Sequence, residues 1–349
     1  MNILGKILEK KEFSIPQKIE GFIIKFYEES DFKELMNLYE IVFPGFMSKE
    51  LWLWKNMKNP FGPFITIVIK DREKIIAAYS VSPREFFIKG KVIPCVLSLD
   101  TMTHPNYQKI GISTFLAKLT YEYAKLNGFY FVYGFPNNNS IYMFEKKLDW
   151  INFGQSELLI KNISGKIKQI DILKKYSVHE IRNFNNEYEN FWEKNCRNLP
   201  IIINKKKDYL NWRYVEHPFV KYRIFLVKLI KTREIVSYFV LKTYTDKNEI
   251  RGGHIVDIFI RTGIYNNRKE IFKIIENHSR KEFQEKCSKI SFWMPDNYLK
   301  NLSLKKLKYK LVKTDPFFGF KLFKNCTYKI SNLNTLSDWY ITMANDDVF

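Results

Sequence analysis

The sequence predicts an α/β protein with mixed sheets, in which one architecture is written twice along the chain. Two observations predict it. Residues 21–160 alternate between runs with the two-residue period of strands and runs with the period of helices. Short strings of the first half also return in the second, in the same order and at an offset near 158 residues. We therefore expect two domains, residues 1–162 and 163–349, each a mixed sheet with helices on both faces.

The repeat depends on four pairs of strings. In the first pair, Trp54-Lys55 with Asn59-Pro60 returns as Trp212-Arg213 with His217-Pro218, at the same spacing. The other pairs are Leu99-Asp100 with Val256-Asp257, Pro136-Asn137-Asn138 with Pro295-Asp296-Asn297, and Lys147-Leu148 before Trp150 with Lys306-Leu307 before Tyr309. A composition rich in Lys, Ile and Asn can create single matches. Four matches in one order favour a duplication.

Local signals predict the elements of the first half in order. Gly21–Tyr27 is strand-like, Ser30-Asp31 has the residue types of a helix cap before an amphipathic run to Val42, and Ser48–Met57 has helical spacing. A helix from Ile112 to Leu126 ends at Asn127-Gly128, a C-cap signal. The remaining expected elements are strands over Phe64–Lys70, Ile75–Ile88, Ile93–Thr101, Phe129–Phe135 and Trp150–Ile160, and a helix over Asn139–Lys147.

Composition narrows the class of protein. Hydrophobic residues make up 46% of the chain, so a folded protein is expected rather than a disordered one. The net charge of +20 favours phosphate-bearing ligands, but no zinc finger, RNA-binding signature or basic-region helix points to nucleic acid. No apolar run suits a membrane span and no secretion signal is recognisable. The four cysteines (Cys95, Cys196, Cys287 and Cys326) lie far apart, so we expect a cytoplasmic protein without a metal site.

The stretch from Asp100 to Thr114 carries the strongest chemical signal. A strand stops at His104-Pro105, and a short loop leads into a helix whose first turn holds Gly111 and Ser113. The first N–H groups of a helix have no intrahelical partner and lie at its positive end. A glycine there lets a diphosphate approach the backbone closely. The loop is therefore adequate to bind a diphosphate, although a single glycine before a helix is also found in ordinary turns.

The pattern Gln108-x-x-Gly111-x-Ser113, placed after Thr103-His104-Pro105, resembles motif A of the GNAT N-acetyltransferase superfamily. Ser113 departs from the family pattern, which has Gly or Ala at that position, but it is still small. Phe135-Pro136-Asn137 and the later Lys147-Leu148 resemble the family's next strand and helix. The resemblance covers about residues 20–160 and implies the acyl-CoA N-acyltransferase fold with acetyl-CoA, or another acyl-CoA, as the cofactor and no metal.

The resemblance also implies roles for residues of the loop. Backbone groups near Met102 and Thr103 would pair with the pantetheine arm as an added strand does. Asn137 or Asn139 would contact the pantetheine end. The remaining residues that it implies for cofactor binding, around the pyrophosphate, are Gln108, Lys109, Ile110, Gly111, Ile112, Ser113 and Thr114.

The second half lacks this loop pattern. After Asp257 the chain continues Ile-Phe-Ile-Arg-Thr-Gly263, shorter than the first-half loop and without Gln-x-x-Gly-x-Ser. We therefore interpret it as a degenerate GNAT-like domain that completes the acceptor pocket or buries an interdomain face. The whole arrangement resembles tandem-GNAT enzymes of bacterial surface-polysaccharide biosynthesis.

Three side chains are candidates for proton transfer. Asp100 lies on the strand beside the expected pantetheine slot and is the first choice as base, although Asp257 at the matching place favours a shared structural role. The family's usual acid is a tyrosine in the helix after the Asn motif. By spacing, Glu145 falls at that point, and Tyr142 nearby can replace it. The tryptophans Trp52, Trp54, Trp192 and Trp212 either stack on a sugar acceptor or belong to the core.

The sequence thus predicts an acetyl-CoA-dependent N-acetyltransferase acting on a small amine. The best candidates are an amino sugar and a nucleotide-linked amino sugar. Two alternatives stay open: acylation of an amino acid or peptide, and a non-catalytic protein that binds CoA or a glycan. The oligomeric state is not indicated.

Overall fold

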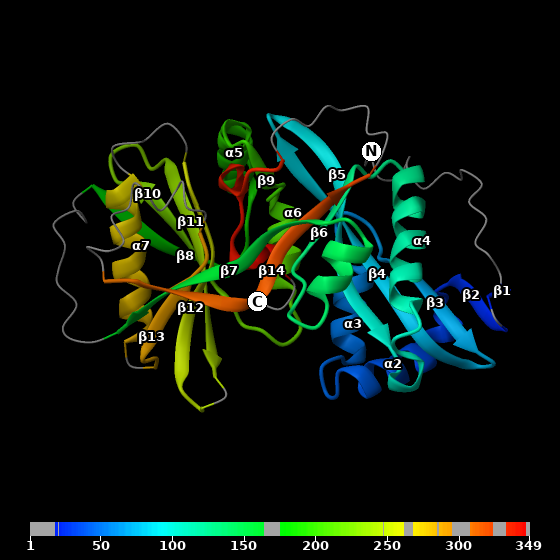
Figure 1. Ribbon diagram of the computed structural model, residues 1–349. Coiled ribbons are helices and arrows are strands. Elements are labelled where there is room, and N and C mark those ends of the chain that lie inside the picture. Colours follow the sequence, from blue (N-terminus) through cyan, green and yellow to red (C-terminus); the bar gives the residue numbers. More distant parts are fainter. Residues whose placement is uncertain are drawn as a thin grey trace. The chain divides into compact units, whose positions relative to one another are not determined.

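The computed structural model describes residues 18–19, 21–163, 175–246, 248–261, 268–284, 286–294, 308–323 and 333–346. The chain forms two compact units that interleave along the sequence (Figure 1). Unit 1 contains Met1–Phe86, Val92–Gly154 and Pro316–Lys329, and unit 2 contains Phe87–Lys91, Gln155–Asp315 and Ile330–Phe349. The division into repeats at residue 162 stays a prediction, and each unit is described by itself.

Unit 1 is built on a mixed sheet with the strand order β1-β2-β3-β4-β5-β6-β14. Strands β1 to β4 pair antiparallel, β5 pairs parallel with β6, and β14 lies antiparallel to β6. The strands are β1 (Lys18–Ile19), β2 (Phe22–Phe26), β3 (Ile65–Asp71), β4 (Lys74–Ile88), β5 (Lys91–Thr103), β6 (Phe131–Gly134) and β14 (Lys310–Leu322). The predicted strands of the first half are confirmed, whereas β14 reaches this sheet from the far end of the sequence.

Helices cover both faces of this sheet, as predicted. Helices α2 (Phe32–Val42) and α3 (Lys49–Met57) bury Leu35 and Trp52 against Ala78 of β4. The next residue of β4, Tyr79, points to the opposite face because side chains alternate along a strand. There its hydroxyl bonds to that of Tyr121, in α4 (Ile112–Leu126), at 2.7 Å. Trp52 and Trp54 are both buried, as the core interpretation expects.

Two local expectations in unit 1 are corrected. The segment Asn139–Lys147 is not one regular helix, because it begins in turns and ends in a short π-helix, η3 (Met143–Lys147). Asp31 does not cap α2 with its side chain. It closes the short helix η1 (Glu29–Asp31), where its carboxylate accepts from the Glu28 backbone N–H at 3.1 Å, and it is paired with Lys25 and Lys70.

In unit 2 the sheet is also mixed, with the strand order β7-β13-β12-β11-β10-β8. Strands β8, β10, β11 and β12 pair antiparallel, β12 is parallel to β13, and β13 is antiparallel to β7. The strands are β7 (Ile151–Asn162), β8 (Tyr176–Ile181), β10 (Arg223–Leu229), β11 (Ile235–Thr245), β12 (Arg251–Ile260) and β13 (Lys289–Phe292). Outside this strand order, β9 (Ile201–Ile203) pairs with β15 (Trp339–Tyr340).

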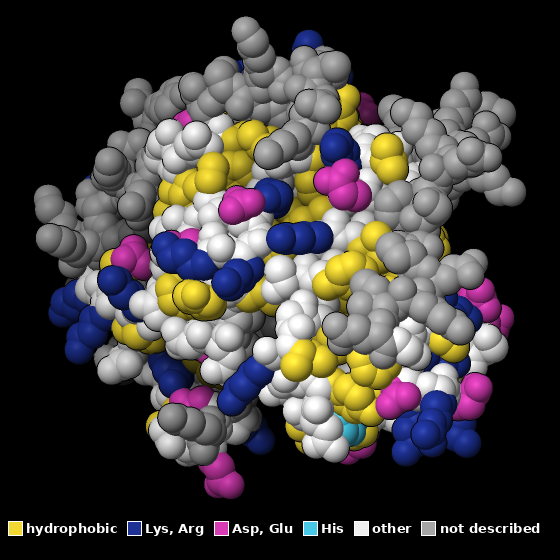
Figure 2. Space-filling model, turned by 45° about the vertical axis from the view of Figure 1, so that its right-hand side comes forward, with side chains coloured by type: hydrophobic (Ala, Val, Ile, Leu, Met, Phe, Trp, Pro, Cys, Tyr) yellow, Lys and Arg dark blue, Asp and Glu magenta, His cyan; other side chains and the backbone are white. Residues whose placement is uncertain are grey.

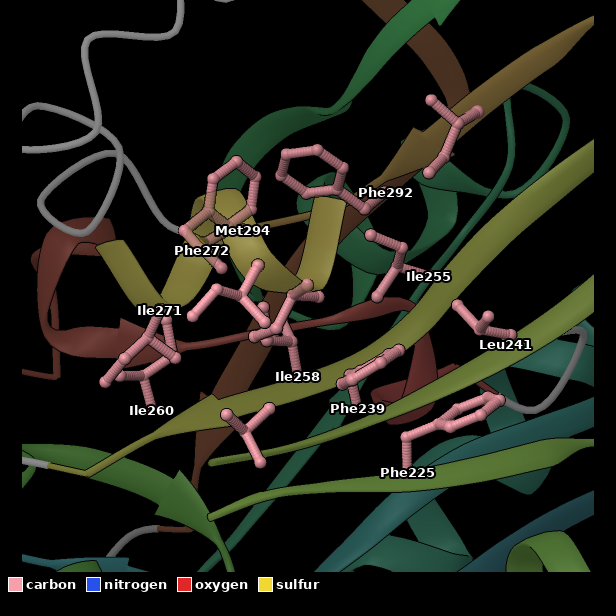
Figure 3. Close-up of a cluster of buried hydrophobic side chains, with 14 of the residues drawn as sticks. Phe225, Phe239, Leu241, Ile255, Ile258, Ile260, Ile271, Phe272, Phe292 and Met294 are labelled. Carbon is pink, nitrogen blue, oxygen red and sulfur yellow. The ribbon is translucent and has the colours of Figure 1, made fainter. Parts of the chain in front are cut away.

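Helix α7 (Arg268–Phe283) packs on one face of this sheet, and the side chains between them form a hydrophobic core of unit 2 (Figure 3). Phe239 of β11 and Ile255 of β12 point toward Ile271 and Phe272 of α7. Each such side chain contributes on the order of 2 kcal/mol when it leaves water. The opposite face is covered in part by α5 (Asn186–Asn195), α6 (Lys207–Leu210) and the π-helix η6 (Asn211–Val215), and Trp192 and Trp212 are buried here. The structure also describes four short helices, η2 (Pro105–Tyr107), η5 (Cys196–Asn198), η8 (Leu336–Asp338) and η9 (Met343–Asn345).

Three expectations from the sequence concern the surface charge, membrane-spanning helices and metal-binding groups. On the face drawn in Figure 2, Lys and Arg side chains are scattered among apolar and uncharged ones. Within the described ranges, no helix is both long enough and apolar enough to cross a membrane. The same residues contain no group of three or more His, Cys, Asp or Glu side chains that could hold a metal ion.

Candidate active site

Strands β5 and β6 separate beside the predicted loop. Register pairs join Val96 to Val132 and Leu97 to Tyr133, and β5 then continues to Thr103 while β6 ends at Gly134. Beyond Leu97, no register pair between these two strands follows in the described chain. Free N–H and C=O groups on a strand edge can bind an extended ligand by β-augmentation. The last residues of β5 thus have no register partner in β6, but Met102 and Thr103, for which pantetheine pairing is predicted, are buried and the Thr103 carbonyl accepts from Gln108.

Asp100 interrupts the regular backbone of β5. Its φ of +46° lies in the left-handed region, which is unfavourable for a residue with a Cβ. Its two carboxylate oxygens accept from Lys55 Nζ at 2.9 and 3.0 Å, and both side chains are only 6% exposed. A buried ion pair of this kind fixes the position of the Asp100 carboxylate beside the Lys55 ammonium. Lys55 was missed by sequence reasoning, which used it only as part of a repeat string.

The segment between β5 and α4 has an ordered backbone. Gln108 donates from Nε2 to the Thr103 carbonyl at 3.2 Å, and the hydroxyls of Thr103 and Ser113 lie 2.7 Å apart. Lys109 and Gly111 have φ values of +67° and +87°. Thr103, Gln108 and Ser113 therefore bond to one another across the loop and hold its two ends together.

Gly111 is the N-cap residue of α4 and has no side chain with which to cap the helix. The place where a Cβ would stand on Gly111 has no heavy atom within 4 Å. Lys109, Ile110 and Gly111 are exposed, and Ile112 begins the helix. The first N–H groups of α4, including those of Ser113 and Thr114, thus have no side-chain cap from the N-cap residue at the positive end of a 15-residue helix. These residues fit the diphosphate of a CoA.

The predicted Asn residues lie on an exposed turn after β6. The Asn137 side-chain oxygen accepts from the backbone N–H groups of Asn139 and Ser140 at 3.0 and 3.1 Å. Asn137 is therefore occupied in ordering this turn, while Asn139 is exposed. Tyr142 is 64% exposed, and Glu145 forms an ion pair with Lys146 at 3.0 Å. The structure brings none of these side chains into a hydrogen bond with Asp100, and their catalytic roles stay predictions.

A second group that sequence reasoning missed is a chain of hydroxyls between β4, β5 and α4. Tyr79 bonds to Ser98 at 2.6 Å and to Tyr121 at 2.7 Å. Burial raises the pKa of both tyrosines above the ordinary range, so both stay protonated. In the sequence, the helical spacing of Tyr121 indicates only a position in the core and no hydrogen-bond partner. The chain ties α4 to β5 at the place where β5 leaves β6.

A model of the acetyltransferase (GNAT) domain family matches residues 24–150. This segment contains the end of β5 that has no partner in β6, the loop and the start of α4. Residues 24–150 are thus similar to a GNAT acetyltransferase domain. The match and the fold support an N-acyltransferase, as the sequence predicts. No curated protein sequence matches the chain.

Solved structures with the same fold cover more of the chain than this domain does. A GCN5-related N-acetyltransferase from Anabaena variabilis has a TM-score of 0.65 and 12% identity, over 85% of this chain and 72% of that one. Saccharomyces cerevisiae N-myristoyltransferase with bound myristoyl-CoA has a TM-score of 0.59 and 12% identity, over 92% and 82%. A glucosamine N-acetyltransferase region of a fungal multi-domain β-N-acetylglucosaminidase has a TM-score of 0.60 and 14% identity, over 89% of this chain and 39% of that one. At these identities the likeness shows the fold.

Proposed function

We propose that this chain transfers an acetyl group from acetyl-CoA to the amine of a small acceptor, with an amino sugar or a nucleotide-linked amino sugar as the preferred class. The observation that supports it best is the open, uncapped start of α4 at Gly111 beside the separated edge of β5. The glucosamine N-acetyltransferase region among the structural neighbours favours the amino-sugar class. The link to surface-polysaccharide biosynthesis and the cytoplasmic location stay predictions.

The second unit is part of the proposal. Its elements follow in the order of a strand, helices, three antiparallel strands, a helix, and a strand parallel to the last of the three. Unit 1 has the same order. This common order supports a tandem GNAT-like arrangement. Residues 262–267, which carry the shortened second-half loop, lie outside the described residues. The degenerate state of the second copy and its part in an acceptor pocket are therefore inferred from its sequence.

The residues of unit 1 define what the protein contributes to such a transfer. A bound acyl-CoA supplies the thioester. The amides from Ile110 to Thr114 hold its diphosphate, and the backbone of Met102 and Thr103 orients its arm. Asp100 removes the proton of the attacking amine, and Lys55 keeps the carboxylate in position. Tyr142 or Glu145 returns a proton to the leaving sulfur.

The test is release of free CoA thiol when the protein is mixed with acetyl-CoA and a panel of amines. We expect turnover with amino sugars, including nucleotide-linked ones, that exceeds turnover with amino acids and short peptides. Turnover confined to amino acids or peptides would favour the second class of acceptor. If no amine raises thiol release above the rate without acceptor while CoA binds, the chain is a binding protein and the proposed transfer is wrong.

Asp100→Asn is expected to lower kcat by about 10²- to 10⁴-fold, the usual contribution of a general base. The amide keeps the size of the carboxylate but removes the counter-charge of the buried Lys55, so the melting temperature is measured as well, and the affinity for CoA of the folded variant should change little. Asp149→Asn is a matched control, since this aspartate of unit 1 is 86% exposed. A kcat for Asp100→Asn within about threefold of that of Asp149→Asn would exclude Asp100 as the base and leave it the structural role that Asp257 suggests.

A further inference from the structure

One side chain of the loop before α4 is bonded to the turn between β3 and β4. The hydroxyl of Tyr107, the last residue of η2, donates to Oδ2 of Asp71 at 2.7 Å. Asp71 is the last residue of β3, and Arg72 follows it with a φ of +53° in the tight turn to β4. The bond joins residues that are 36 positions apart in the chain, and neither of them has a part in the proton transfers proposed above.

The ring of Tyr107 also has two aromatic contacts. It meets the ring of Phe22 in β2 edge to face at 5.9 Å between centroids, and the ring of His104 at 5.7 Å. The backbone N–H of His104 donates to the carbonyl of Ile76 in β4 at 2.8 Å, and its Nδ1 accepts from the Asn106 N–H at 3.2 Å. Helix η2 is therefore bonded or packed against three strands of unit 1, namely β2, β3 and β4.

The bond between Tyr107 and Asp71 is of a strong type. The hydrogen bond to Asp71, followed by partial burial, raises the pKa of Tyr107, so the phenol stays protonated at neutral pH. A hydroxyl that donates to a carboxylate forms a charge-assisted bond, which is roughly twice as strong as a bond between neutral groups. We therefore expect this bond to contribute more than the other contacts that hold η2.

The exposed turn before α4 begins directly after Tyr107. Gln108 comes next and is bonded to the Thr103 carbonyl, and residues 109–111 are exposed up to the start of the helix. A loop that already has its binding shape loses less conformational entropy when a ligand arrives. A fixed residue at position 107 thus limits the conformations that the exposed turn can adopt.

We propose that Tyr107 is a positioning residue for the acyl donor and that it acts through its hydrogen bond to Asp71. The bond holds η2 against the β3–β4 turn and keeps residues 109–111 in the shape in which the start of α4 receives a diphosphate. Tyr107 lies outside the groups proposed to transfer protons, so it affects the affinity for the donor and not the rate of transfer from bound donor. The inference rests on the proposed function, because it requires that this loop binds CoA.

The experiment is a double-mutant cycle on the full chain, with the Kd for CoA from calorimetry and steady-state kinetics with acetyl-CoA. We expect Tyr107→Phe and Asp71→Ala each to raise the Kd for CoA and the KM for acetyl-CoA about five- to tenfold, because a charge-assisted bond is lost. We expect kcat to stay within about twofold of the wild-type value. The double variant should bind CoA no more weakly than the weaker single variant, because both changes remove the same bond.

Tyr27→Phe is the matched control. The hydroxyl of Tyr27, also in unit 1, is buried and has no hydrogen-bond partner among the residues that the structure describes. Equal Kd values for Tyr27→Phe and Tyr107→Phe overturn the inference, and so does a cycle in which the two single losses add. A lower kcat with an unchanged Kd overturns it as well. Asp71→Asn keeps an oxygen acceptor, so it should weaken CoA binding less than Asp71→Ala, and it replaces Asp71→Ala in the cycle if that variant has a lower melting temperature.

The wild-type protein separates this inference from the proposed function. The Kd for CoA is measured without an amine, so the bond is tested even if no acceptor in the panel is turned over. A wild-type chain that binds no CoA contradicts both the proposed function and the role of Tyr107. A wild-type chain that binds CoA with the same Kd as Tyr107→Phe contradicts the role of Tyr107 alone.

Discussion

Gly111→Trp is expected to lower kcat/KM for acetyl-CoA by about 100-fold or more, which corresponds to about 2.7 kcal/mol of lost binding. The site of a Cβ on Gly111 opens to space with no heavy atom within 4 Å, at the uncapped start of α4. An indole there stands where a diphosphate would meet the helix amides. The measurement is steady-state kinetics together with the Kd for CoA.

Gly21→Trp is a closely matched control. Gly21 has the same φ of +87°, is exposed in the turn between β1 and β2, and has no heavy atom within 4 Å of an added Cβ. Both variants therefore bear the same backbone strain, on the order of 1 kcal/mol. Equal affinity for CoA in the two variants would show that the start of α4 does not hold the diphosphate, and the proposed function would lose its main support.

Asp257→Asn is expected to destabilise unit 2 by about 3–5 kcal/mol, because it leaves a buried ammonium without a counter-charge. Asp257 and Lys205 are both fully buried and paired. The carboxylate also accepts from Tyr238 at 2.8 Å, Tyr214 at 3.1 Å and Thr342 at 2.9 Å. Denaturant unfolding followed by tryptophan fluorescence measures the change in the free energy of unfolding.

Asp246→Asn is the control for burial. It removes an ion pair with Lys289 whose side chains are 22% and 23% exposed, so its cost is expected to be at most about 1 kcal/mol. In the background of Asp257→Asn, Lys205→Met is expected to restore part of the loss, since the unpaired charge is removed. An Asp257→Asn variant as stable as Asp246→Asn would contradict the view that this buried pair holds unit 2 together.

The elements that sequence reasoning placed correctly depend on local signals. Asn127-Gly128 ends α4 because glycine enters the left-handed region at little cost, with a φ of +82° at Gly128. The strand at β5 and the loop that follows also depend on neighbouring residues alone. The expected helix over Asn139–Lys147 failed because its apolar pattern does not distinguish a regular helix from turns and a π-helix.

The sequence by itself determined the order of strands and helices in residues 21–160 and the place of the loop before α4, because periodicity, caps and glycine positions act over a few residues. Only the tertiary structure decided which distant groups meet. Lys55 pairs with Asp100 and Lys205 with Asp257, although these lysines do not match in the repeat strings, and β14 joins the sheet of unit 1 beside β6. A long-range pairing depends on the burial and hydrogen bonding of the whole fold, so a local sequence pattern does not predict it.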